Sequence, residues 1–547
     1  MFSSVKYGPW YPGNAVLGCA PPKVELVARI MRARSMTESS LLKPDRTSLF
    51  RDTLSEELGL AVTSLSDSGF TSLMTYDEFR RYYWGQECFR KLSIEDPATV
   101  RVLEVEAVEK LLLKECLTAE LDDRLRTFRL CGKGLTPSTA DAIRKARKIV
   151  ARLLGKFSWD RVVEHVRWGP GASTEFSRKA SSHQNKWACV THATADVLPL
   201  VESFSYWSKF NFGDVVEVGG NRITTVPKDA QKRRTIAIEP TWNMFFQLGI
   251  EGVIRRCLNR AGLLCESATE NAQKRHQELA RVGSTCPGLF PTLDFRDASN
   301  SISRGLCGLL LPSDWLDAMY RVRSHVAELP DGTHVPLAMF STMGNGYTFA
   351  LMTLLIYSLS SAVVGGPTSV FGDDLILPDA QQVDTVCGVF EELGFSLNIG
   401  KSFWKGHFRE SCGGHFYRGR DVTPPYFKRE LKHLQSYISY GNALTRRYRR
   451  CEAWRLLLDC VPRGFRGPEG FGDSVLVTEW DMATPRWSQD YQCWYGQSLV
   501  GYHPMRDAPE IGALRHALYG AREAGLEVYR GNSDLAYRTG VWLSPRW

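Results

Sequence analysis

The sequence lacks the cysteine patterns and the leader that mark zinc-binding and secreted proteins. Its 14 cysteines are scattered over 547 residues, with no C-x-x-C pair and no cysteine or histidine ligand spacing. This argues against a zinc site and a disulfide framework, and it fits a reducing cytosol. The first 18 residues lack the charged start, the apolar run and the cleavage site of a signal peptide, so we expect no export.

The sequence also lacks an uninterrupted apolar run that would make a membrane helix. No charged residue occurs from Val335 to Gly372, and residues 349–364 are mostly apolar. However, Gly344-Asn345-Gly346 comes before this stretch and Gly365-Gly366-Pro367 ends it, which argues against a membrane span. We expect a buried helix that leads into a buried strand, and no membrane association.

Positive charge is in only small excess over negative charge. The net charge is +8 over 547 residues, so we expect an anionic partner to meet local basic clusters rather than a uniformly basic surface. A chain of this length exceeds the size at which single cores usually split, which predicts several lobes. Residues 1–220 are mainly helical in pattern, with clear helical periods at residues 103–113 and 139–154. The second helix has an outward basic face, which fits RNA contact or an ordinary solvated surface.

What the sequence does contain is a short acidic segment around which the other motifs are arranged. In Val370-Phe371-Gly372-Asp373-Asp374-Leu375-Ile376, β-forming residues flank a glycine, which predicts a β-hairpin with Asp373 and Asp374 at its turn. Adjacent carboxylates repel each other unless a cation lies between them, and such oxygen ligands suit Mg²⁺. Taken alone, the segment is equally compatible with an ordinary acidic turn.

A third carboxylate ends another predicted strand. Thr292-Leu293-Asp294-Phe295 is a short apolar run that turns polar, and a carboxylate at the end of a buried strand is costly unless it is paired or metal-bound. If this strand lies beside the acidic hairpin, three acids converge on one cation site. Two metal ions use such a site for in-line phosphoryl transfer. Taken alone, Asp294 is as compatible with a helix cap.

A basic segment lies upstream of both acidic motifs. Residues 215–226 predict strands around Gly219-Gly220-Asn221, and the cations Lys228, Lys232, Arg233 and Arg234 follow within seven positions. Because alternate side chains of an extended segment point the same way, we expect Lys228, Lys232 and Arg234 to share a face that meets a triphosphate or a nucleic-acid backbone. A solvated basic loop is the alternative. A long, buried helix is predicted at residues 241–258.

The rest of the chain adds one candidate catalytic residue. A helix is predicted at residues 383–393, and a turn and strand at residues 394–403 contain Lys401, which is either a proton donor to a leaving pyrophosphate or a surface cation. Another small hairpin is predicted at residues 408–417. The section from about residue 423 is helical and basic and then rich in Trp and Tyr.

Taken in order, these motifs resemble the replicase subunit of the positive-strand RNA bacteriophages, the leviviruses of the Q-beta type. The resemblance is strongest over residues 226–424, and length and motif order extend it to the whole chain. The segments that carry it are VPKDAQKRRTIAIEPTWNMFFQLGIEG, LDFRDASNSIS, STMGNGYTF, FGDDLILP, LGFSLNIGKSF and FRESCGGHFY.

The resemblance implies an α+β fold of the right-hand polymerase type, with fingers, thumb and an antiparallel palm sheet backed by helices. We expect mainly fingers with part of the palm helices in residues 1–290, the palm in 291–425, and the thumb and C-terminal region in 426–547. It implies primer-independent synthesis of RNA from an RNA template by two-metal phosphoryl transfer, in the replication of a phage RNA genome. The expected cofactor is Mg²⁺, as two ions, with Mn²⁺ or Ca²⁺ able to occupy the sites.

The resemblance also assigns roles to residues. The chain departs from the family pattern at Phe371, where the family has Tyr, and at Asn300, where it has Asp. The expected catalytic residues are Asp294, Asp373, Asp374 and Lys401, the metal site is assigned to Asp294, Phe295, Asp373 and Asp374, and nucleotide binding is assigned to Lys228, Arg234, Ser299, Asn300, Gly344, Asn345 and Gly346.

Unprimed initiation leads to one further hypothesis. Two initiating nucleotides pair weakly with the template, so the protein must supply a stacking surface, which aromatic rings do well. The candidates, which are equally compatible with a thumb core, are Trp480, Trp487, Tyr491 and Trp494.

The expected partners are RNA template and product, nucleoside triphosphates, the host translation elongation factors Tu and Ts, and a host RNA-binding or ribosomal protein. The expected location is the cytoplasm of the infected bacterium. Two other functions share some of these features. A reverse transcriptase shares the two-metal chemistry but is expected to place a bulky residue where the small polar Ser299 and Asn300 stand. A non-catalytic RNA-binding protein on the same scaffold has no reason to keep the three aspartates together.

Overall fold

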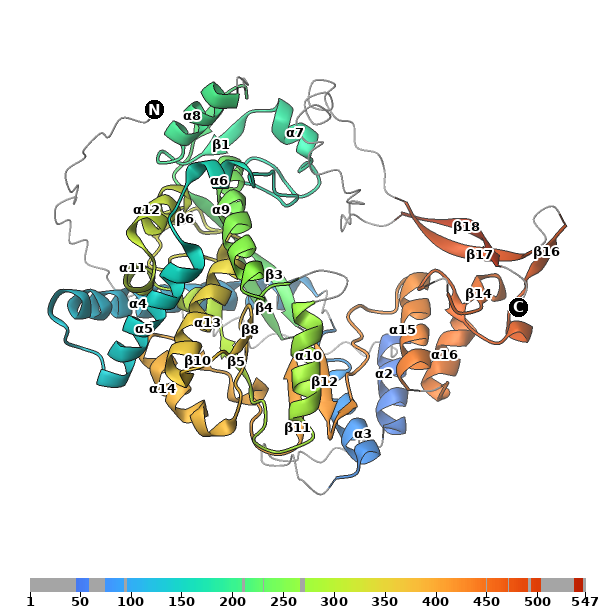
Figure 1. Cartoon of the computed structure of the whole chain (residues 1–547). Coiled ribbons are helices and arrows are strands. Elements are labelled where there is room, and N and C mark those ends of the chain that lie inside the picture. The colour runs from blue at the N-terminus through green and yellow to red at the C-terminus, as the bar shows by residue number, and fades with distance from the viewer. Residues whose placement is uncertain are drawn as a thin grey trace. The chain divides into compact units, whose positions relative to one another are not determined.

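The computed structural model describes residues 46–58, 74–92, 96–208, 212–229, 231–265, 271–448, 450–470, 472–489, 493–502 and 536–544. The chain divides into two compact units, residues 1–49 and 50–547, and the second is described below. Its architecture is mixed α+β (Figure 1). Within the described ranges, no helix is both long enough and apolar enough to span a membrane.

The secondary-structure elements keep one numbering throughout. The helices are α2 (Arg46–Glu57), α3 (Tyr76–Glu87), α4 (Pro97–Cys131), α5 (Pro137–Leu154), α6 (Trp159–Val163), α7 (His183–Ala188), α8 (Leu198–Ser208), α9 (Thr241–Arg260), α10 (Ala272–Gly283), α11 (Arg304–Leu310), α12 (Ser313–Val322), α13 (Thr348–Val364), α14 (Val383–Glu392), α15 (Leu434–Arg447) and α16 (Glu452–Cys460). The strands are β1 (Thr191–Ala193), β2 (Val215–Glu217), β3 (Asn221–Asp229), β4 (Lys232–Ile238), β5 (Thr292–Arg296), β6 (Val326–Glu328), β7 (His334–Pro336), β8 (Ser369–Phe371), β9 (Asp374–Ile376), β10 (Ser396–Leu397), β11 (Phe408–Ser411), β12 (Gly414–Tyr417), β13 (Arg420–Asp421), β14 (Arg466–Gly467), β15 (Leu476–Val477), β16 (Arg486–Ser488), β17 (Cys493–Tyr502) and β18 (Ala536–Ser544). The 3-10 helices are η1 (Ala298–Ser301), η2 (Ala380–Gln382), η3 (Ile399–Lys401), η4 (Arg463–Phe465) and η5 (Trp480–Met482).

A small antiparallel sheet with the strand order β10-β5-β9-β8 lies at the centre. Its inward side chains, such as Leu293, Val370 and Leu375, are buried in the main hydrophobic core. The helices α13 and α14 pack against β8 and β10, and α5 packs along α13, as Figure 1 shows. The sheet is therefore backed by helices, which carry most of the apolar surface of this core.

The acidic hairpin forms as the sequence predicts. β8 and β9 are joined by Gly372 and Asp373, and Gly372 has a φ of 64°, which favours glycine. A Cβ at Gly372 would also lie 2.7 Å from the ring of Phe349, and its N–H donates to Thr353 Oγ1 at 3.0 Å. The turn is thus fixed against α13, and position 372 has no room for a side chain.

The predicted helices at residues 139–154, 241–258 and 349–364 are confirmed as α5, α9 and α13. The pattern at residues 103–113 belongs to the much longer α4, whose end at Gly132 has the left-handed conformation of a C-terminal cap. The predicted hairpin at residues 408–417 is formed by β11 and β12.

The strands predicted around Gly219-Gly220-Asn221 form but do not pair with each other. β2 pairs in parallel with β1, whereas β3 pairs with β4 and with β6. A Cβ at Gly220 would collide with the carbonyl of Val326, so glycine permits the close approach of β6. Alternation in the sequence predicts strands but not their partners.

A second hydrophobic core joins segments from the two ends of the chain. Phe50 and Leu54 of α2 and Phe79 of α3 are buried with residues of β11, β12, α15 and α16. The rings of Phe79 and Tyr417 stack with centroids 4.0 Å apart. The N-terminal helices after residue 49 therefore pack with the C-terminal part of the chain, not with the elements that follow them in sequence.

Candidate active site

Three aspartates meet at the end of the central sheet because of strand register. Asp294 on β5 lies directly opposite Asp374 on β9, and Asp373 occupies the adjacent turn. Directly opposed residues of antiparallel strands point to the same face of the sheet, with Cβ atoms about 5 Å apart. Asp373 is exposed, whereas Asp294 and Asp374 are half-buried. Segments 80 residues apart in the sequence thus supply neighbouring carboxylates.

Each of the two opposed acids has a hydrogen-bond partner that the sequence did not reveal. The side chain of Asn398 donates to Asp294 Oδ2 at 2.6 Å, and the backbone N–H of Cys412 donates to Asp374 Oδ2 at 3.0 Å. Ser402 Oγ accepts from the backbone N–H of Asp294 at 3.0 Å. These partners lie inside the predicted motifs at residues 394–403 and 408–417, but only the fold shows which acid each one binds.

The acids are held in an environment that resists their ionisation. Burial, together with the charge of Asp373 and against the attraction of Lys401, raises the pKa of Asp294 to about 6. Burial and Asp373 raise the pKa of Asp374 to about 7, although the Cys412 N–H bond opposes this. A site that concentrates negative charge in this way gains from a bound cation.

The donor chemistry fits divalent metal ions, which prefer carboxylate oxygens. Asn398 occupies one oxygen of Asp294, and Asp373 faces solvent, so both have an oxygen to offer. The ring of Phe295 is stacked on Phe390, so only its backbone carbonyl is a candidate ligand. Among the described residues, no group of three His, Cys, Asp or Glu side chains is arranged to hold a metal ion. The assignment of ligands stays a prediction.

Lys401 lies within electrostatic range of this site. It ends the 3-10 helix η3, and its charge acts on Asp294 and on Glu410. Glu410 on β11 is half-buried, and burial raises its pKa against the attraction of Lys401. The sequence analysis missed Glu410 as a fourth acid near the site, although it lies in the motif FRESCGGHFY.

The basic hairpin β3–β4 brings Lys228 and Arg234 toward the same region. Burial lowers the pKa of Lys228, as do the charges of Arg234 and Lys401, while Asp297 raises it. Arg233 has a different role, since it donates to Thr225 and pairs with Glu104 at 3.2 Å. The shared face expected for Lys228, Lys232 and Arg234 stays a prediction.

The residues after β5 form a tight turn. Asp297 has a φ of 47°, unusual for a residue other than glycine, and its carboxylate pairs with Lys110 at 2.6 Å. Ser299 is buried and donates to Asn300 Oδ1 at 3.3 Å. Ser299 and Asn300 follow Asp294 closely in the sequence, and their contact with a ribose stays a prediction.

Residues 344–346 form a packed loop. A Cβ at Gly344 would collide with the carbonyl of Ala237 on β4, and the N–H of Gly346 donates to Gln247 Oε1 at 2.9 Å. Asn345 is buried, and its side chain accepts from the N–H of Tyr347. The loop is therefore fixed to the basic hairpin and to α9, and its contact with nucleotide stays a prediction.

A buried acid that the sequence analysis missed supports this loop. Glu239 follows β4 and accepts hydrogen bonds from Asn221 at 3.0 Å, Gln247 at 3.2 Å and Ser324 at 2.6 Å. Burial raises the pKa of Glu239. Because Gln247 also binds Gly346, this network connects the basic hairpin, α9 and the loop.

The candidate stacking residues are spread over several elements. Trp480 lies in η5 with 38% of its surface exposed, and Trp487 on β16 is half-buried. Trp494 pairs in register with Trp487, and Tyr491 lies outside the described residues.

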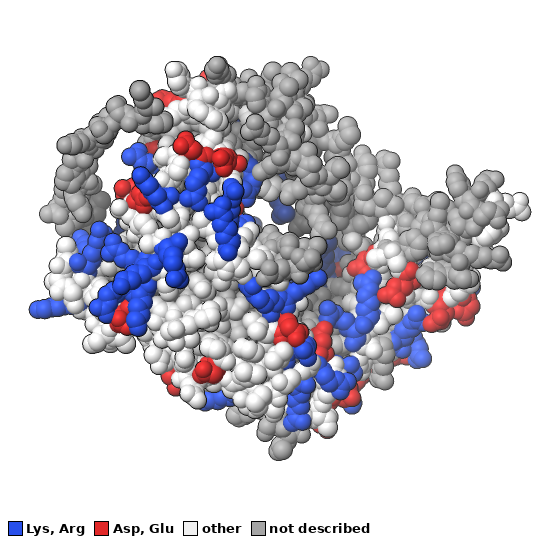
Figure 2. Space-filling model, viewed as in Figure 1, with Lys and Arg blue, Asp and Glu red and all other residues white. Residues whose placement is uncertain are grey.

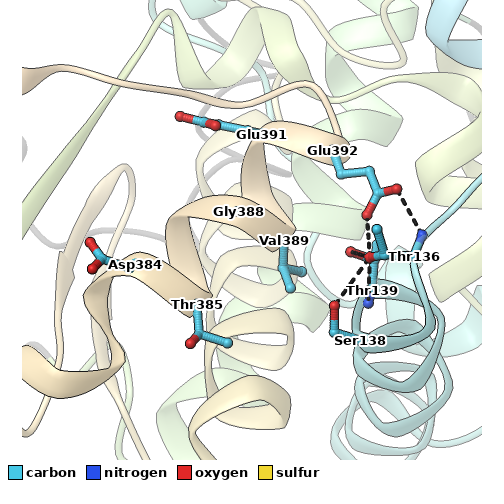
Figure 3. A pocket seen from close by; sticks show the side chains of 9 residues that line it. All are labelled: Thr136, Ser138, Thr139, Asp384, Thr385, Gly388, Val389, Glu391 and Glu392. Atoms are coloured by element: carbon cyan, nitrogen blue, oxygen red, sulfur yellow. Dashed lines mark hydrogen bonds between the residues drawn. The ribbon is translucent and has the colours of Figure 1, made fainter.

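A pocket of about 430 Å³ has none of these acids in its lining. It is formed where α14 meets the N-terminus of α5, and Glu392 accepts hydrogen bonds there from the backbone and the hydroxyl of Thr136 (Figure 3). Its lining residues are Thr136, Ser138, Thr139, Asp384, Thr385, Gly388, Val389, Glu391 and Glu392. Thr136 is the N-terminal cap of α5, and Glu392 already binds its backbone N–H and its hydroxyl.

Comparison with known proteins identifies the family. Residues 47–455 match the family described as RNA replicase, beta-chain. The RNA-directed RNA polymerase subunit beta of Enterobacteria phage SP is 34% identical over 398 residues, which cover 68% of this chain and 67% of the relative. That of Escherichia virus Qbeta is 36% identical over 357 residues, covering 61% of this chain and 59% of the relative.

The crystal structure of the RNA-dependent RNA polymerase of a human picorbirnavirus aligns over 80% of this chain and 86% of that chain, with a TM-score of 0.45 and 14% identity.

The class of the protein is that of its relatives, RNA-directed RNA polymerase. Within that class, the chain belongs to the RNA replicase beta-chain family of RNA phages. This membership supports the expected resemblance and weighs against both the reverse-transcriptase and the non-catalytic alternatives.

Proposed function

We propose that the chain copies an RNA template into RNA without a primer, by two-metal phosphoryl transfer, in the replication of a phage genome. The observation that carries this proposal is the register of the central sheet, which sets Asp294 opposite Asp374 and beside Asp373. A charged cluster of this kind suits a reaction in which negative charge moves between phosphate oxygens.

In this proposal the chain's own residues divide the work. Asp294, Asp373 and the carbonyl of Phe295 would hold the metal ions, and Asp374 would support them while bound to the N–H of Cys412. Mg²⁺, when bound, activates the attacking hydroxyl and stabilises the leaving pyrophosphate. Lys228 and Arg234 bind the triphosphate, and Lys401 donates a proton to the pyrophosphate.

The proposal also covers the fold and the partners. We assign the central sheet and its helices to the palm of a right-hand polymerase, with fingers mainly in residues 1–290, palm in 291–425 and thumb in 426–547. Elongation factors Tu and Ts and a host RNA-binding or ribosomal protein are the proposed partners, in the cytoplasm of the infected bacterium. Purification of the chain from its host, followed by identification of the co-purifying proteins, tests these partners.

The catalytic part is tested by Asp373→Asn in the purified replicase. The change removes a metal ligand at an exposed turn and leaves the basic surfaces intact, so nucleotide incorporation should be abolished while RNA binding survives. Asp379→Asn, beyond the same hairpin, is the matched control. Incorporation close to that of the unmodified chain in Mg²⁺ would contradict the assignment.

A further inference from the structure

One face of α5 carries a dense run of cations that the proposed catalytic site does not use. Between Ala142 and Trp159 the sequence has six Lys and Arg residues and no Asp or Glu. All six side chains are exposed. They are Arg144, Lys145, Arg147, Lys148 and Arg152 on α5 and Lys156 just after its end, and we call them the α5 basic face.

Helical geometry places these cations on the side opposite the core. Arg144, Lys148 and Arg152 recur every fourth residue and so form a row with successive Cα atoms about 6 Å apart along the helix. The buried side chains of α5, such as Ile143 and Val150, point the other way into the main core. The cations therefore lie outside the main hydrophobic core.

The charge of this face is only partly compensated. Asp141 binds both Arg144 at 2.5 Å and Lys145 at 2.8 Å. Among the described residues, Arg147, Lys148 and Arg152 have no acidic partner within ion-pair distance. Figure 2 shows Lys and Arg side chains gathered over the region of α5 and continuing toward α6 and α9. Like charges held this close on a helix repel, and an anionic partner relieves that repulsion.

The α5 basic face is separate from the catalytic sheet. α5 packs along α13, and α13 packs against β8, so α13 separates α5 from the strand that leads to the acidic turn. Phosphates that contact this face therefore lie on RNA outside the catalytic site.

We infer that the α5 basic face is a second RNA-binding surface, which holds the phosphate backbone of template or product RNA away from the site of synthesis. This inference rests on the proposed function, which supplies RNA longer than the catalytic site covers. The face consists of long, flexible cations without an exposed aromatic anchor, which suits backbone contacts that do not depend on sequence. A protein interface would be expected to centre on buried aromatic or Arg anchors in a packed patch.

Two changes of opposite sign test the inference in the purified replicase. The triple variant Arg147→Gln, Lys148→Gln and Arg152→Gln removes three phosphate contacts. Its binding to a long single-stranded RNA should lose about 2 from the slope of log affinity against log salt, because each contact contributes about 0.7. Affinity should fall up to about 100-fold near 0.1 M salt and converge with the unmodified protein near 1 M. Asp141→Asn frees Arg144 and Lys145 and should raise affinity severalfold.

The matched control is the triple variant Arg126→Gln, Arg281→Gln and Arg455→Gln. It makes the same change in net charge, but each cation is already paired with an acid three residues away. The control should keep the salt slope, and both triple variants should keep incorporation on a template too short to reach α5. An unchanged slope in the α5 variant, or an equal change in the control, overturns the inference. If the unmodified chain incorporated no nucleotide on the short template, that result would instead refute the proposed function.

Discussion

The central sheet and the aromatic segment at residues 480–494 both contain candidate functional residues, but the fold arranges these residues differently in the two regions. In the sheet, Asp294 and Asp374 are far apart in sequence and become direct neighbours through strand register. In the C-terminal segment, Trp480 and Trp487 are close in sequence but belong to different elements, η5 and β16. Strand pairing therefore builds a site from distant residues, whereas closeness in sequence does not by itself build a surface.

The largest effect should separate two acids within the sheet. Asp294→Asn removes a ligand whose second oxygen is available to a metal, and we expect incorporation to fall by at least about a thousandfold. Asp374→Asn keeps an amide oxygen that still accepts from Cys412 N–H, so its loss should be clearly smaller. Single-turnover incorporation at saturating nucleotide and Mg²⁺ measures both. Equal losses would show that Asp374 is as directly involved as Asp294.

The basic hairpin offers the next comparison. Arg234→Ala should raise the KM for nucleoside triphosphates roughly tenfold to a hundredfold, since a charge-assisted hydrogen bond is worth about 1.5 to 3 kcal/mol. Arg233→Ala is the control, because Arg233 pairs with Glu104 and Thr225 within the fold. Arg233→Ala should mainly lower the melting temperature and should change the KM for nucleoside triphosphates little. If Arg234→Ala weakens template binding and leaves KM unchanged, Arg234 belongs to the RNA channel.

The raised pKa values of Asp294 and Asp374, about 6 and about 7, predict a pH effect in the metal-free protein. A carboxyl whose folded pKa is raised favours the folded state most at low pH, and this contribution is lost as pH rises from about 4 through the folded pKa. The melting temperature in EDTA should therefore fall between pH 5 and pH 8 more steeply than that of Asp374→Asn. Added Mg²⁺ should reduce this fall. Parallel pH profiles for the two proteins would argue that the surroundings of Asp374 do not raise its pKa.

The smallest effect should come from the aromatic segment. If Trp480 stacks on the initiating nucleotides, Trp480→Ala should remove about 1 to 3 kcal/mol of stacking free energy per base. The rate of unprimed synthesis should then fall, and synthesis from an annealed primer should be spared. Trp487→Ala is the comparison, because Trp487 is half-buried on β16 and should lose both activities together with thermal stability. Equal loss of both activities in Trp480→Ala would place the stacking surface elsewhere.

The sequence predicted more of the elements than of their contacts. The acidic hairpin, the strand that carries Asp294 and the helices α5, α9 and α13 follow from local patterns, since glycine, β-branched residues and helical periodicity act over a few positions. The partners Asn398 and Cys412, the support of the loop by Glu239 and Gln247, and the packing of α2 and α3 with the C-terminal helices depend on long-range register. A single sequence does not encode such pairings in any local pattern.

The most direct test of the central claim is binding of Mn²⁺ to the purified chain, followed by electron paramagnetic resonance at pH 8. The account predicts that Asp294→Asn and Asp373→Asn each weaken Mn²⁺ binding at least about tenfold. Asp384→Asn, in the first turn of α14 and in the lining of the pocket beside α5, should keep it unchanged. Unchanged Mn²⁺ binding in both Asp294→Asn and Asp373→Asn would contradict the claim that the register of the central sheet builds the metal site.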